Sequence, residues 1–115
     1  MENTENRVPE FEIKKLKEEI KVASEYQRFL KNQRKTEKIV GKREMSHSEA
    51  TMKHRHNRLK LSAMFVAYGV MRGKSFEDEM KAHVTKKEEN LYDASHVKDM
   101  AEKFIIDYRI KQLAE

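Results

Sequence analysis

Residues 13–30 carry a seam of mainly apolar side chains at alternating steps of three and four, and this periodicity constrains the fold more than any other feature. The seam consists of Ile13, Leu16, Ile20, Ala23, Gln27 and Leu30. Such steps bring side chains onto one face of an α-helix. Pro9 suits the entry to that helix, because the first turn leaves its backbone N–H groups unpaired. The pattern predicts a long amphipathic helix over residues 10–36.

A second long helix is predicted after a polar stretch. Residues 36–45 are almost wholly polar and include Gly41, which indicates a connecting loop or a frayed extension of the first helix. Ser46 followed by Glu49 is a capping-box pattern that starts a helix, with Ser48 as a competing cap. The seam of this helix reads Met52, His56, Leu59, Ala63, Val66 and Val70, and Gly73 ends it. Beyond Leu59 apolar residues occur nearly all round, so we expect that end to be buried.

The remainder of the chain predicts two further helices. Ser75 with Asp78 three residues later is a capping pattern for a short helix. Its apolar side consists of Phe76, Met80 and Val84. After a charged loop over residues 85–90, Asp93 or Ser95 is expected to cap a last helix. The broad apolar stripe of that helix consists of Val97, Met100, Ala101, Phe104, Ile105, Tyr108 and Leu113.

The composition supports a helical fold class. With three Gly and one Pro in 115 residues, the chain has few of the turn formers that an all-β fold requires. We predict an all-α domain over residues 1–115. It is a small helical bundle of two long helices, one short helix and a C-terminal closing helix, with residues 1–9 as a flexible N-terminus.

The same composition bears on the compartment. The chain has no cysteine, so neither disulfides nor thiolate zinc sites hold it together. Its first residues are polar and lack the apolar run of a signal peptide. The longest mainly apolar run, residues 63–71, is about half as long as a membrane span. We therefore expect a cytoplasmic protein with no membrane partner.

The positive charge of the chain is concentrated in one segment. Residues 31–60 hold ten Lys or Arg and three acidic residues, whereas the segments before and after carry nearly balanced charge. Local potential, rather than total charge, attracts an acidic partner. If the two long helices fold back on each other, the basic residues of both meet at one end. The residues predicted to bind a partner or nucleic acid are Lys31, Asn32, Gln33, Arg34, Lys35, Lys38, Lys53, His54, Arg55 and Arg58.

Catalytic and metal-binding patterns are lacking in the sequence. The chain contains no Gly-rich phosphate loop, no GxSxG turn and no HExxH motif, so we expect no enzyme activity and no cofactor. His54 and His56 lie two residues apart, which places them about 200° apart around a helix, where they cannot share one ion. No metal site is therefore predicted.

Five short stretches also carry a resemblance. The order FLKNQRKT (29–36), EA (49–50), KHRHNRLKL (53–61), AYG (67–69) and RGKS (72–75) resembles small uncharacterised proteins encoded by bacteriophages. The resemblance covers roughly residues 25–75. Small helical phage proteins of this type often act by binding host machinery, and anti-CRISPR proteins and other inhibitors of host defence are the most similar functional group. The resemblance implies a host defence nuclease, or its guide RNA, as the partner.

The simplest interpretation of the basic segment is a solvated loop end without a partner. Three hypotheses assign the chain a function instead. The first is a phage-type inhibitor that docks on a nucleic-acid-handling effector of host defence. The second is a protein that grips RNA or DNA directly through the same residues. The third is an assembly or virion-associated structural protein, a homodimer in the simplest case, whose first helix pairs with a copy of itself through Ile20 and Leu30.

Overall fold

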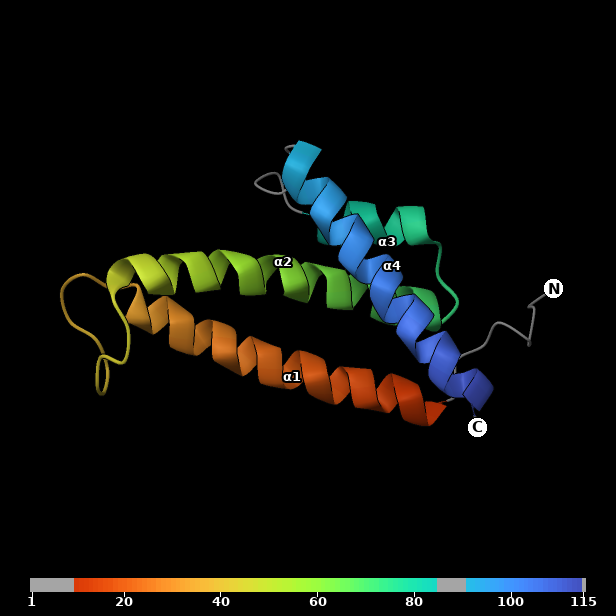
Figure 1. Ribbon diagram of the computed structural model, residues 1–115, viewed down its shortest axis with the longest axis horizontal. Helices are drawn as coiled ribbons and strands as arrows, with labels where there is room; N and C mark the ends of the chain where they lie inside the picture. The colour runs from red at the N-terminus through yellow and green to blue at the C-terminus, as the bar shows by residue number, and fades with distance from the viewer. Residues whose placement is uncertain (1–9, 85–90, 115) are drawn as a thin grey trace.

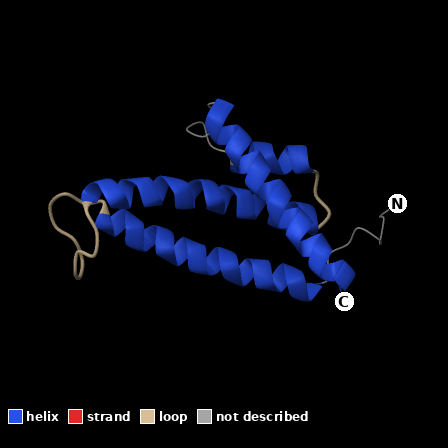
Figure 2. Ribbon diagram, viewed as in Figure 1, coloured by secondary structure: helices blue, strands red, loops and turns tan. Residues whose placement is uncertain are grey.

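The computed structural model describes the backbone of residues 10–84 and 91–114, and the side chains of residues 10–84 and 93–107. Within these ranges the chain forms four helices and no strand, which confirms the predicted all-α bundle (Figure 2). The helices are α1 (Glu10–Gln33), α2 (His47–Met71), α3 (Phe76–His83) and α4 (Leu91–Ala114). The predicted flexible segment 1–9 and the charged loop 85–90 lie outside the described residues.

Helix α2 is the central element of the bundle. Helices α1 and α2 form an antiparallel pair joined by the loop 34–46, and α3 and α4 pack against α2 from other sides (Figure 1). The loop lies at one end of the molecule, and the last turns of α4 lie toward the opposite end (Figure 1). No helix in the described part of the chain combines the length and apolar character needed to cross a membrane.

Two clusters of buried apolar side chains lie on different faces of α2. The first cluster contains Ile13, Leu16, Ile20, Ala23, Met64, Ala67 and Met71, and it joins α1 to α2. The second contains Leu59, Ala63, Val66, Val97 and Ala101, and it joins α2 to α4. Phe104 of α4 packs against both clusters. Burial on both faces explains why apolar residues surround the second half of α2.

The seam of α1 is occupied within the chain. Ile20 and Leu30 are buried, and the seam residues from Ile13 to Ala23 pack with α2. Polar groups complete this interface, because the Asn57 side-chain amide donates to the Ala23 carbonyl at 3.0 Å and to Gln27 Oε1 at 2.8 Å. The seam therefore does not offer the free surface that self-pairing through Ile20 and Leu30 would need.

Three predicted helix boundaries are confirmed. The Ser46 side chain accepts a hydrogen bond from the Glu49 N–H at 3.2 Å, so Ser46 rather than Ser48 caps α2. After Met71, Gly73 adopts a φ of 94°. The Lys74 N–H then bonds the Gly69 carbonyl and the Gly73 N–H bonds the Val70 carbonyl, which is the Schellman arrangement. Ser75 caps α3 by accepting from the Asp78 N–H.

Other details of the sequence prediction are wrong. Helix α1 ends at Gln33 rather than at residue 36, and the Gln33 side chain bonds the loop that follows. Met52 and His56 are exposed, Met52 by 73%, although both belong to the predicted seam of α2. On this face of α2, the apolar cluster that α2 forms with α4 begins only at Leu59.

The predicted cap of the last helix is also wrong. Helix α4 begins at Leu91, so Asp93 and Ser95 lie inside its first turns rather than before it. Asp93 is buried, with 2% of its surface exposed, and its carboxylate bonds Arg55 of α2. An acid inside the first turn still suits the positive end of the helix dipole. The carboxylate therefore ties α4 to α2.

Candidate functional site

The loop between α1 and α2 is held in place by the last side chains of α1. The Asn32 side-chain amide donates to the Val40 carbonyl at 2.9 Å, and its oxygen accepts from the Val40 N–H at 3.0 Å. This two-way bond ties the middle of the loop to the helix end. Asn32 was predicted as a partner contact, but both polar atoms of its side chain bind the loop backbone.

Gln33 is the central support of the loop. Its side chain is fully buried; it donates to the Lys42 carbonyl at 3.0 Å and accepts from the Glu44 N–H at 2.8 Å. Backbone groups thus satisfy both ends of its amide. Gln33 was predicted as a binding residue, but its buried side chain supports the loop and does not form part of the exposed surface. The sequence gives no sign of this, because a glutamine in a charged segment has the composition of a surface residue.

Arg34 and His54 link the loop to α2. Arg34 Nη1 lies 3.0 Å from His54 Nδ1, and the Gln27 side chain donates to the His54 carbonyl at 3.3 Å. An arginine can only donate, so His54 Nδ1 is the acceptor in this pair. Both residues are half-buried. They contribute to the packing of the loop end against α2 more than to its outer surface.

Exposed cations remain at the loop end, and we call Lys31, Lys35, Lys38, Lys42 and Arg43 the basic tip. All five are exposed, and no ion pair joins them to a carboxylate within the described residues. The three lysines at 31, 35 and 38 were predicted. Lys42 and Arg43 were not, although they lie in the same basic segment and its charge count includes them.

Arg43 also stabilises the end of α1. Its guanidinium donates to the Gln33 carbonyl at 3.0 Å and to the Lys35 carbonyl. A cation at this position satisfies carbonyl groups that the last helical turn leaves unpaired and complements the negative end of the helix dipole. Its positive charge still reaches the surface, because hydrogen bonds to neutral carbonyls do not cancel it.

The predicted cations of α2 differ from those of the basic tip. Arg55 Nη2 lies 2.7 Å from a carboxylate oxygen of Asp93, and Lys53 Nζ lies 3.0 Å from Glu49 Oε1. The hydrogen bond and charge of Glu49 raise the pKa of Lys53 above its usual 10.5. Arg58 is half-buried. The structure therefore brings together one exposed part of the predicted surface and pairs two of the predicted cations of α2 with acids.

The aromatic side chains of α1 near the basic tip stack on each other. The ring centroids of Tyr26 and Phe29 are 6.1 Å apart, with 19° between the ring planes. Phe29 is half-buried and Tyr26 is exposed. Phe29 lies beside the basic segment, where a ring can either close the core or stack on a nucleic acid base. Its half-buried position supports a part in packing at the loop end.

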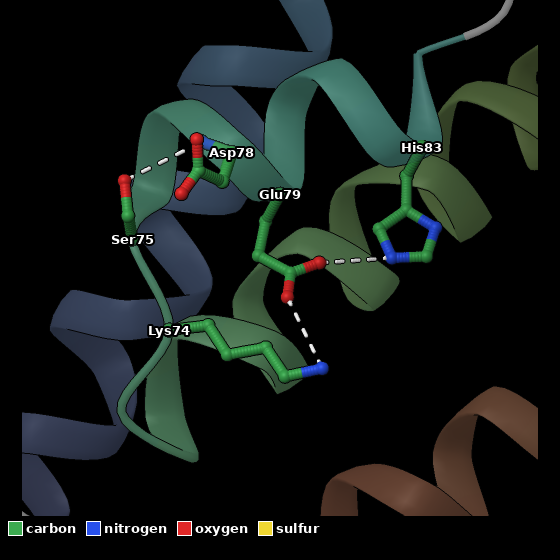
Figure 3. A network of polar contacts seen from close by, with 5 residues as sticks. All are labelled: Lys74, Ser75, Asp78, Glu79 and His83. Atoms are coloured by element: carbon green, nitrogen blue, oxygen red, sulfur yellow. Dashed lines mark hydrogen bonds and ion pairs between the residues drawn. The ribbon is translucent and has the colours of Figure 1, made fainter.

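A second polar site, missed by the sequence analysis, surrounds Glu79 of α3. Glu79 retains 6% exposure, and its two carboxylate oxygens lie 3.0 Å from His83 Nε2 and 3.8 Å from Lys74 Nζ (Figure 3). Its carboxylate lies against Gly69 of α2, where an added Cβ would be 2.3 Å from Glu79 Cδ. The only signal in the sequence is Gly69 inside an apolar helix, since such a glycine often marks a close approach.

No metal centre is formed by the described side chains, since no group of three or more His, Asp or Glu residues gathers among them. His54 bonds Arg34, and the His56 ring packs near the His96 ring with centroids 6.4 Å apart. In comparisons with known proteins, no family model, no curated protein and no solved structure matches the chain.

Proposed function

We propose that this chain is a non-enzymatic binding protein that inhibits a nucleic-acid-handling effector by docking its basic tip on an anionic surface. The observation that carries the proposal is the group of five exposed cations without carboxylate partners in the described residues. The loop that bears four of them is fixed by Asn32 and Gln33, and the fifth, Lys31, lies in the last turn of α1. A fixed loop loses little conformational freedom on binding, so more of the interaction free energy appears as affinity.

The dense group of unpaired cations at the loop end favours a compact anionic target. Proteins that track a nucleic acid strand place cations along a groove. Here the cations further along α2 are engaged, since Lys53 pairs with Glu49 and Arg55 with Asp93. A narrow basic tip suits guide-RNA phosphates exposed on an effector, or a carboxylate-lined surface such as the metal site of a nuclease.

The resemblance of residues 25–75 to small phage proteins supports a host defence effector as the target, and this inhibitor would act in the cytoplasm of the host cell. Direct binding of RNA or DNA is the second candidate. The four lysines of the basic tip favour it, because lysine contacts phosphates without regard to base sequence.

A charge-reversal pair of variants tests the proposal. The tip variant replaces Lys31, Lys35 and Lys38 by Glu, and the control variant replaces the exposed Lys14, Lys98 and Lys103 by Glu. Both variants change the net charge equally. Tagged full-length chains are used for affinity capture from host extract, with and without nuclease treatment. We expect the tip variant to lose at least about tenfold in capture of the effector, and the control variant to retain it.

The salt dependence of binding to free nucleic acid separates the two candidates. If the chain binds RNA or DNA directly, log K falls linearly with log salt concentration, and the tip variant reduces that slope. An inhibitor that docks on an effector leaves free nucleic acid unbound at physiological salt. Nuclease treatment then distinguishes guide-RNA phosphates, whose removal abolishes capture, from a carboxylate-lined protein surface. Equal capture by the tip and control variants would contradict the proposed role of the tip.

A further inference from the structure

A cavity of about 520 Å³ opens where α1, α2 and α3 meet. This volume lies within the range of small-molecule sites, which are mostly apolar with a few polar groups that orient the ligand. The cavity lies away from the basic tip, because its lining comes from the second half of α2, from α3 and from the middle of α1. The residues that define its chemistry are Lys17, Lys21, Phe65, Tyr68, Arg72 and Glu79.

The charge of this cavity is positive. The buried Glu79 carboxylate is already bound by Lys74 and His83 (Figure 3). Lys17, Lys21 and Arg72 also line the cavity, and none of the three is ion-paired within the described residues. Glu18 is the other carboxylate of the lining. These three cations outnumber Glu18, so the lining has an excess positive charge that an anionic group can neutralise.

Two aromatic side chains give the cavity flat apolar walls. The Phe65 ring stacks on the His83 ring, with centroids 5.3 Å apart and 17° between the planes. The Arg72 guanidinium lies 5.4 Å from the centroid of the Tyr68 ring. Phe65 is 37% exposed although it lies on the central helix. Flat ring surfaces beside cations favour a ligand that is itself aromatic and negatively charged.

We propose that this cavity binds a small aromatic anion, meaning a ring system that carries a carboxylate, sulfonate or phosphate group. The rings of Phe65 and Tyr68 contact the aromatic body, and Lys17, Lys21 and Arg72 hold the anionic group. Glu79 keeps Lys74 and His83 in place beneath the ligand. The inference does not depend on the basic tip or on its partner, because no residue of the tip lines the cavity.

Fluorescence titration with 8-anilinonaphthalene-1-sulfonate tests the proposal, since this probe combines aromatic rings with a sulfonate. We expect saturable binding of one probe per chain. Lys21→Glu and Arg72→Glu are each expected to weaken binding about tenfold, because a reversal replaces an attraction with a repulsion. Lys14→Glu is the matched control on α1; Lys14 is exposed and outside the cavity lining, so binding is expected to stay within about twofold.

Two further measurements exclude general adsorption of the probe to apolar surface. The neutral analogue N-phenyl-1-naphthylamine is expected to bind more weakly than the sulfonate and to ignore both charge reversals. A second groove, lined in part by Val22, Tyr26 and Phe104, is tested with Val22→Glu, which is expected to leave binding unchanged. Lack of saturable binding, equal loss in Lys14→Glu and Lys21→Glu, or loss in Val22→Glu would each overturn the proposal.

Discussion

A buried polar side chain from a neighbouring helix lies near each end of α2, Gln33 of α1 at one end and Glu79 of α3 at the other, but these side chains are satisfied in different ways. At the loop end, Gln33 binds the backbone groups of Lys42 and Glu44. At the other end, Glu79 binds the side chains of Lys74 and His83. A neutral amide that bonds backbone groups fixes a loop and leaves the nearby cations unpaired. A buried carboxylate must be compensated, so it draws nearby cations into the structure.

This difference explains where positive charge remains available. Around Gln33 the lysines of the basic tip form no ion pair with a carboxylate of the described residues, so their charge is directed to solvent. Around Glu79 two cationic groups are held by one acid, and the uncompensated charge lies on the rim of a cavity. The first arrangement suits a large anionic partner, and the second suits a small one.

The largest effect is expected from Gly69→Ala at the Glu79 end. The added methyl group would lie 2.3 Å from Glu79 Cδ, so the buried carboxylate must move. After the gain of about 1 kcal/mol in helix propensity is subtracted, overpacking of this kind is expected to lower the free energy of unfolding by about 2–3 kcal/mol. Urea denaturation measures the change.

Glu79→Ala in the Gly69→Ala background is the control, because it removes the atoms that clash. The double-mutant cycle is expected to show a coupling of at least about 1 kcal/mol, with part of the stability restored. A Gly69→Ala variant as stable as the natural chain would show that Glu79 moves freely, so that its carboxylate is not held in place as the Gln33 amide is.

Gln33→Leu tests the loop end and is expected to cost about 2 kcal/mol. The substitution keeps a similar volume but leaves the Lys42 carbonyl and the Glu44 N–H without the partner that each has now. Hydrogen exchange of the Glu44 amide, measured by NMR, is expected to accelerate more than exchange in α2.

Gln33→Glu serves as the comparison, because a carboxylate still accepts from the Glu44 N–H but cannot donate to the Lys42 carbonyl. It is expected to protect the Glu44 amide while losing part of the stability. If exchange in the loop is unchanged in Gln33→Leu, then Gln33 does not fix the basic tip, and the contrast between the two ends fails.

A smaller effect is expected from Arg55→Met, which removes a compensated charge between the two ends. Arg55 is more than half exposed, whereas Asp93 is buried. Solvent screens the pair on one side, so we expect a loss of about 1 kcal/mol in the free energy of unfolding. Arg28→Met is the control, since Arg28 is exposed and forms no ion pair with any residue that the structure describes. Equal losses in the two variants would show that the Arg55 pair contributes nothing specific.

The sequence predicts much of this fold because local signals determine it. The seam of α1 and the caps Ser46 and Ser75 depend on residues close together in the chain, and the structure confirms them. Errors occur where a distant element decides. Met52 fits the apolar period of α2, but it is exposed because the apolar cluster with α4 begins only at Leu59.

The candidate site was predicted less well, for a related reason. The position of the lysines at the loop end follows from the hairpin of α1 and α2. The burial of Gln33 and the pairing of Arg55 with Asp93 depend on side-chain contacts between segments 9–38 residues apart in the chain. Composition cannot distinguish a glutamine that supports a loop from one that faces a partner, or an arginine that is paired from one that is available.

The smallest effect is expected from the exposed pair of Lys53 and Glu49, and its pH dependence tests whether the charges of α2 are truly compensated. The hydrogen bond and charge of Glu49 raise the pKa of Lys53 above 10.5, so protonated Lys53 favours the folded chain. This stabilisation is fully present below the unfolded pKa and is lost as pH rises through the folded pKa. The difference in melting temperature between the natural chain and Lys53→Met should therefore be small but measurable at neutral pH and vanish well above pH 10.5.

High salt at neutral pH should reduce this difference as well, because solvent and ions screen an exposed pair. A difference that persists at high pH would mean that packing by the lysine stem, rather than its charge, stabilises this turn, and Lys53 would then count with the available cations of the basic tip.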